Sequence, residues 1–237
     1  MGVFLESLIE SFKLIFYLDK EVLSITLLSF KVSLTAVILA SLIAIPLALL
    51  ISNKVFGAKK ILISIIHTGM ALPPVVVGLI VYMFLSRNGL LGYLDLLYTP
   101  KAMIIAQIII VFPIIIGISL SALNSVKKKI RETAITLGAT KFQYAMKTIK
   151  EAKQGIVTAV ITAFGRAIGE VGAIIIVGGN IRFHTRALTT AIVLETRRGE
   201  FAIAMALGII LIGLAFLINF TLTHIQQKKV ELWTYSK

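Results

Sequence analysis

The stretch LSITLLSFKVSLTAVILASLIAIPLALLI, residues 23–51, carries a single charged side chain, Lys31. A helix needs about 20 mainly apolar residues to cross the hydrocarbon core of a bilayer, and this stretch exceeds that length. Four further stretches of the same kind follow, at about residues 61–85, 102–123, 155–178 and 202–224. The sequence therefore predicts an all-α integral membrane protein with about five membrane-spanning helices.

The composition of the whole chain supports this class. Of its 237 residues, 58% are hydrophobic and 15% are charged, whereas about a quarter of the residues of a soluble domain are charged. A soluble core of this size would leave too little polar surface to cover it. The net charge of +13 comes from Lys and Arg residues in particular loops, which indicates membrane orientation and no nucleic-acid partner.

Metal and disulfide chemistry are not expected. The chain has no cysteine, and its three histidines, His67, His184 and His224, are scattered. We therefore predict neither a disulfide framework nor a metal site.

Residues 1–20 differ from a secretory signal peptide, because acidic side chains stand where such a peptide has cations. Apolar residues recur there at helical spacing, with Glu6, Glu10 and Lys13 on another face. This pattern is typical of an interfacial amphipathic helix. A sixth, tilted span is the alternative, although the stretch is short for a bilayer.

The loops alternate in charge. Residues 52–60 and 124–154 are rich in lysine, which places them in the cytoplasm. Five crossings then put the C-terminal tail, with Lys228 and Lys229, inside and the N-terminus outside. Loop 179–201 breaks the rule that Lys and Arg gather in cytoplasmic loops, because it is placed outside and yet holds four arginines. These residues are Arg182, Arg186, Arg197 and Arg198.

The cytoplasmic segment 124–154 is longer than a connection between packed helices needs. Its part KKKIRETAITLGATKFQYAMKTIKEA, residues 127–152, predicts two short helices joined by a turn near Gly138. Such a pair would protrude from the membrane and could bind a soluble partner. The alternative is a solvated basic loop.

Glu132, Thr133 and Ala134, followed by Gly138, resemble the EAA loop of permease subunits of type I ATP-binding-cassette (ABC) importers. Thr133 stands where that family has its middle alanine, and TIKEAKQGI, residues 148–156, lacks the family's later proline. The resemblance implies a cytoplasmic coupling helix that docks in a groove of a separate ATPase. The implied coupling residues are Glu132, Thr133, Ala134, Leu137, Gly138 and Ala139.

Four other stretches resemble permeases for tetrahedral oxyanions: molybdate, sulfate and tungstate. They are ALPPVVVGL (71–79), NGLLG (88–92), FGRAIGEVGAIIIVGGNI (164–181) and TTAIVLETRRGEF (189–201). The last two look most like the tungstate branch. Molybdate and sulfate stay open as substrates.

The resemblance also implies the partners and the location. We expect a homodimer in a prokaryotic cell (inner) membrane, with two ATPase subunits that carry ATP and Mg²⁺ and an extracytoplasmic oxyanion-binding protein. The chain itself has no G-x-x-x-x-G-K-[ST] loop, so we expect no enzymatic activity and no cofactor of its own. The implied domains are an N-terminal helix (1–20), the permease domain (21–226) and a cytoplasmic tail (227–237).

Arg166 and Glu170 fall near the middle of the fourth predicted span. A charge there costs about 2.5–3.5 kcal/mol on insertion scales, so both side chains should face protein or water. They form either a structural ion pair at spacing i, i+4 or an element of the anion pathway. In the second case Arg166 attracts the anion and Glu170 holds the orientation of Arg166. Pro73 and Pro74 interrupt the second span and predict either a gate or a simple kink.

The exterior residues Asn180, Arg182, Arg186, Arg197 and Arg198 are predicted to form the mouth through which the anion enters. The alternatives are contacts with lipid phosphates or salt bridges to a docked partner.

Other classes of membrane protein fit the sequence less well. An ion-coupled carrier usually has duplicated halves, a channel needs a filter or charged ring, and a membrane enzyme needs a cluster of catalytic groups.

Overall fold

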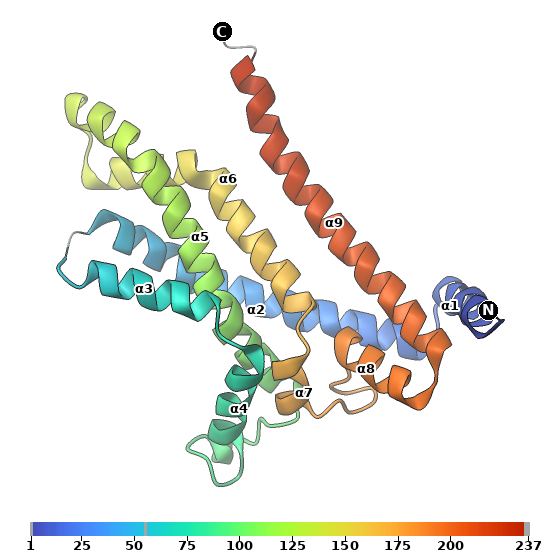
Figure 1. Cartoon of the computed structure of the whole chain (residues 1–237). Coiled ribbons are helices and arrows are strands. Elements are labelled where there is room, and N and C mark those ends of the chain that lie inside the picture. Colours follow the sequence, from blue (N-terminus) through green and yellow to red (C-terminus); the bar gives the residue numbers. More distant parts are fainter. Residues whose placement is uncertain (1, 55, 235–237) are drawn as a thin grey trace.

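The structure is a computed structural model that describes residues 2–54 and 56–234, without the side chains of residues 127–135, 141 and 225–234. The described residues form helices and no strands, which confirms the all-α membrane fold (Figure 1). The elements are α1 (Gly2–Phe16), α2 (Lys20–Asn53), α3 (Lys59–Met70), α4 (Pro74–Leu85), η1 (Gly92–Leu94), α5 (Pro100–Thr136), α6 (Lys141–Ile168), α7 (Gly172–Gly178), α8 (Leu188–Arg198) and α9 (Phe201–Thr234).

Within the described residues, three helical stretches are long and apolar enough to cross a membrane alone. These are Lys20–Asn53, Pro100–Val126 and Phe201–His224. Two more candidates are bent pairs, α3 with α4 at 97° and α6 with α7 at 59°. The five predicted crossings are therefore reached only if each bent pair counts as one span.

The α3–α4 break follows from its prolines. Pro74 occupies the first turn of α4 and Pro73 is extended, with φ −63° and ψ 123°. Proline lacks an N–H and disfavours helical geometry in the residue before it, so α3 ends before the pair and α4 begins with it. The interruption predicted at Pro73 and Pro74 thus has a local cause.

The α6–α7 break has no proline, and it corrects our expectation of a continuous helix over 155–178. The helix ends at Ile168, with Gly169 as its C-cap, and a new one begins at Gly172. Glu170 therefore lies between two helices, whereas Arg166 lies in the last turn of α6. The spacing i, i+4 brings the two side chains together even so.

The segment 124–154, predicted to be cytoplasmic, is also built differently from expectation. Its helices are not two separate short ones: α5 extends to Thr136 and α6 starts at Lys141. The turn between them is where it was predicted, with Gly138 at φ +65°. Thr140 begins α6 with a capping box to Gln143. Neither extension contains Gly or Pro, so nothing stops either helix at the membrane surface.

Helix α5 forms the centre of the bundle, with α2, α3 and α6 packed on it (Figure 1). On α2, fully buried alanines recur every four residues, which allows close helix approach. They are Ala36, Ala40, Ala44 and Ala48. Helix α9 diverges from the bundle toward its C-terminal end, and only 17% of its most apolar window is buried. Helix α1 packs against α9.

Candidate functional site

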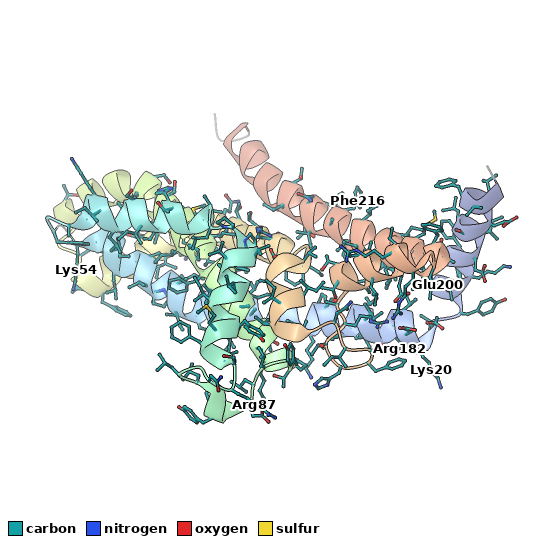
Figure 2. All side chains as sticks on the ribbon, turned by 60° about the horizontal axis from the view of Figure 1, so that its bottom comes forward. Lys20, Lys54, Arg87, Arg182, Glu200 and Phe216 are labelled. Carbon is teal, nitrogen blue, oxygen red and sulfur yellow. The ribbon has the colours of Figure 1, made fainter. Side chains whose placement is uncertain are left out.

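An ion-pair network joins the loop 179–201, which was predicted to lie outside, to the start of α2. One edge of the Arg182 guanidinium donates to both carboxylate oxygens of Glu21, with Nε–Oε1 at 3.0 Å and Nη2–Oε2 at 2.6 Å. Arg186 donates Nη1 to Glu21 at 3.0 Å and to Glu195 of α8 at 3.1 Å. Arg198 reaches Glu195 at 3.5 Å. Figure 2 shows Arg182 close to the start of α2, near Lys20.

Local structure fixes these carboxylates. Asp19 caps α2 by accepting from the backbone N–H groups of Glu21 and Val22, which sets the direction in which Glu21 leaves the first turn. The hydrogen bond to Glu21 raises the pKa of Arg182 above its ordinary value, so this guanidinium stays charged at any physiological pH.

The predicted exterior residues therefore divide into two groups. Arg182, Arg186 and Arg198 pair with carboxylates of the chain itself, whereas Arg197 is exposed at the end of α8. Asn180 has φ +52° and donates Nδ2 to the carbonyl of Thr190 at 3.3 Å, so it shapes the loop. Sequence reasoning missed Glu21, because no local signal connects it with a loop about 160 residues later.

This division predicts unequal losses of stability. Arg186 is 7% exposed and sits between two acidic side chains. Arg186→Gln removes the cation that joins Glu21 to the buried Glu195 and leaves them only the exposed Arg182 and Arg198, so it is expected to lower the free energy of unfolding by about 3 kcal/mol. Arg197→Gln, at an exposed position, should change it by no more than about 0.5 kcal/mol. Denaturant unfolding of the purified variants measures both; equal effects would contradict the network.

Arg166 and Glu170 form a close ion pair, with Nη1–Oε2 at 2.6 Å. Glu170 is 3% exposed, and its other oxygen accepts from the backbone N–H of Ala173 in α7 at 3.2 Å. The side chain of Arg166 is 38% exposed. The Glu170 carboxylate is thus bonded by both Arg166 and Ala173, whereas the Arg166 side chain remains partly exposed.

The short helices that follow the two breaks lie against each other at backbone distance (Figure 1). A Cβ on Gly78 of α4 would lie 2.7 Å from the Cα of Ala173, and one on Gly172 would lie 2.5 Å from Cγ2 of Val75. Only glycine fits at such contacts. The breaks at Pro73–Pro74 and at Glu170 therefore lead into one packed pair, α4 with α7.

The predicted coupling residues lie far from these breaks, at the tip of the cytoplasmic segment. Leu137 is 77% exposed, and Gly138 and Ala139 are exposed beside it. A Cβ on Gly138 would meet nothing within 4 Å. The side chains of Glu132, Thr133 and Ala134 lie outside the described residues.

A groove of about 570 Å³ lies between α3, α5 and α6, and no sequence signal pointed to it. Its polar lining comes from His67, Ser121, Ser125, Glu151, Gln154 and Thr158. Small residues such as Gly117 and Gly155 leave room for it. Among the described residues, no three His, Asp or Glu side chains gather where they could hold a metal ion.

Residues 36–231 match the family described as binding-protein-dependent transport system inner membrane component. A probable anion ABC transporter permease protein of Haloferax volcanii is 45% identical over 201 residues, which cover 83% of this chain and 87% of that protein. The tungstate uptake system permease protein TupB of Peptoclostridium acidaminophilum is 41% identical over 210 residues, covering 89% and 92%. The molybdenum transport system permease protein ModB of Escherichia coli K12 is 32% identical over 201 residues, covering 81% and 87%.

Among solved structures, a chain of a bacterial alginate ABC transporter in complex with an alginate-bound periplasmic protein has a TM-score of 0.71. It is 22% identical to this chain, and the match covers 90% of this chain and 80% of that one. That likeness shows the fold. The family model and the sequence relatives show that the chain belongs to the family of inner-membrane components of binding-protein-dependent transport systems, the permease subunits of ABC importers.

Proposed function

We propose that this permease translocates a tetrahedral oxyanion, tungstate before molybdate or sulfate, across the cell membrane. The observation that carries the proposal is the near full-length similarity to relatives named for tungstate uptake, at 41% and 36% identity. The relatives named for molybdenum and sulfate transport are less similar, at 32% and 25%.

In the proposed assembly, two copies of the chain form the pathway and two ATPase subunits bind the cytoplasmic tips, residues 131–145. The ATPases hold ATP and Mg²⁺, since the chain has no phosphate-binding loop. It thus acts as a permease without catalysis or a cofactor of its own. An extracytoplasmic binding protein delivers the anion to the face that carries Arg182 and Arg197. The N-terminus lies outside. Impermeant thiol reagents test this: a single cysteine at residue 2 should react from outside, as should one at Asn88, whereas one at Leu137 should react from the cytoplasm.

The geometry of α6 supports alternating access as the mechanism. This helix starts three residues after Gly138 and ends at Ile168, next to Glu170. Its 28 residues measure about 42 Å along the helix at 1.5 Å per residue. A displacement of the coupling turn by the ATPases would therefore reach the Arg166–Glu170 pair through a single unbroken helix. The positive potential of Arg166 would lower the barrier for a dianion on that side.

Uptake in reconstituted vesicles tests the substrate. The permease, its ATPase and its binding protein are assembled in proteoliposomes, and the uptake of labelled tungstate, molybdate and sulfate is compared at equal concentrations. We expect ATP-dependent uptake with tungstate preferred. An ATPase with its phosphate-binding lysine replaced serves as the control without hydrolysis. Uptake of sulfate in preference to both metal oxyanions would refute the assignment.

A further inference from the structure

The break between α6 and α7 interrupts the helical hydrogen bonds within a predicted span. In an unbroken helix, the carbonyl of Ala167 would accept from the N–H of Val171, and that of Glu170 from Ile174. Lipid supplies no donor in their place, so backbone at membrane depth must find partners inside the protein. The N–H of Glu170 turns back to the carbonyl of Ala167 at 3.2 Å, whereas the carbonyl of Glu170 precedes α7 and loses its helical donor, so further donors must come from elsewhere.

Two side chains from other helices supply them. Gln107 of α5 donates Nε2 to the carbonyl of Ala167 at 2.9 Å. Thr189 of α8 donates its hydroxyl to the carbonyl of Glu170 at 2.6 Å. Gln107 also donates to Ser33 Oγ of α2 at 3.2 Å. Gln107 and Thr189 are 1% and 6% exposed, so water does not compete for these bonds.

The stability of the core alone does not account for Gln107. Its amide nitrogen must face the carbonyl of Ala167, because a carbonyl can only accept. Its Oε1 is then buried without a hydrogen-bond partner among the described residues. An apolar side chain would avoid that unpaired oxygen and would suit the buried neighbours Met103 and Ile110. What it could not provide is the donor to Ala167.

We propose that Gln107 and Thr189 are positioning residues of transport, which hold the α6–α7 break and thereby keep the Arg166–Glu170 pair in place. Ala167 follows Arg166 directly, and Thr189 holds the backbone of Glu170 itself. The carboxylate of Glu170 is held in addition by the N–H of Ala173. Each partner of the ion pair thus has a side chain from another helix bonded at or next to its own backbone. The inference rests on the proposed function, in which Arg166 lies beside the path of the anion.

The test uses the complete transporter with its ATPase and binding protein in vesicles. Thr189→Val and Gln107→Leu are each expected to lower the maximal uptake rate about tenfold. The concentration of loaded binding protein that gives half-maximal uptake should stay unchanged, because neither residue is exposed. Thr189→Ser keeps the hydroxyl and should retain uptake. Ser119→Ala is the matched control: Ser119 is buried on the same helix as Gln107, and its hydroxyl has no hydrogen-bond partner among the described residues.

A distance measurement separates positioning from other causes. The chain has no cysteine, so spin labels can be placed by Thr162→Cys on α6 and Ile175→Cys on α7, both exposed. We expect a broader or shifted distance distribution in Thr189→Val and Gln107→Leu than in the parent and in Ser119→Ala. If Gln107→Leu does not fold, the comparison of Thr189→Val with Thr189→Ser still tests the positioning role.

Unchanged uptake would overturn the proposal, and so would reduced uptake with the parent's distance distribution. The proposed substrate can be wrong independently of this positioning role. If the parent carries molybdate instead of tungstate, the comparison between variants is made with molybdate. If it carries no oxyanion, the proposed function is lost, while the distances still show whether the two residues hold the break.

Discussion

Gly138→Trp is expected to abolish the stimulation of ATP hydrolysis by loaded binding protein, while the membrane domain still folds. Gly138 lies at the exposed turn between α5 and α6, and a Cβ there would meet nothing within 4 Å, so the indole causes no clash inside the chain. It would instead stand where the ATPase groove is proposed to bind. Loss of this docking contact costs about 2 kcal/mol or more, which corresponds to a decrease of about 30-fold or more in the rate of coupled ATP hydrolysis. ATPase assays of the reconstituted complex measure it.

Gly138→Ala is the control for the backbone. Gly138 has φ +65°, and any L side chain there costs about 1–2 kcal/mol. Alanine shares this strain with tryptophan but adds little bulk, so we expect most of the coupling to remain. If alanine and tryptophan reduce coupling equally, the turn matters through its conformation, and the docking role of Gly138 is refuted.

The double variant Arg166→Gln with Glu170→Gln is expected to fold well and to transport poorly. Arg166→Gln alone leaves Glu170, which is 3% exposed, without its cation, and should cost about 3–5 kcal/mol of stability. Glu170→Gln alone should cost less, because Arg166 is 38% exposed and can reach polar surroundings. In the double variant two amides can share a hydrogen bond, so most of the stability should return.

Transport distinguishes the two interpretations of this pair. If Arg166 attracts the anion, uptake by the double variant should stay at least about tenfold below the parent, since the positive potential is gone. If the pair is structural only, uptake should recover together with stability. Thermal unfolding and vesicle uptake of the same preparations give the answer. Recovery of both would remove Arg166 from the pathway.

The amino-acid sequence determined those features that depend on a residue and its near neighbours. Long apolar runs are excluded from water wherever they lie, so the membrane class and the approximate spans could be predicted. Pro73 and Pro74 restrict their own backbone and that of the preceding residue, and Gly138 tolerates a left-handed turn. The break in the second span and the cytoplasmic turn were therefore predictable, although the flanking helices proved longer than expected.

Only the tertiary structure decided which distant groups meet. At the break after Ile168, the carbonyls of Ala167 and Glu170 accept from Gln107 and Thr189, which lie on helices that sequence reasoning could not place beside it. The arginines of loop 179–201 looked free in the sequence, yet Glu21, far away in the chain, forms ion pairs with two of them. Hydrogen bonds and ion pairs of this kind depend on where whole helices pack, because their geometry is satisfied only within about 3 Å, and no periodicity in a single segment encodes that distance.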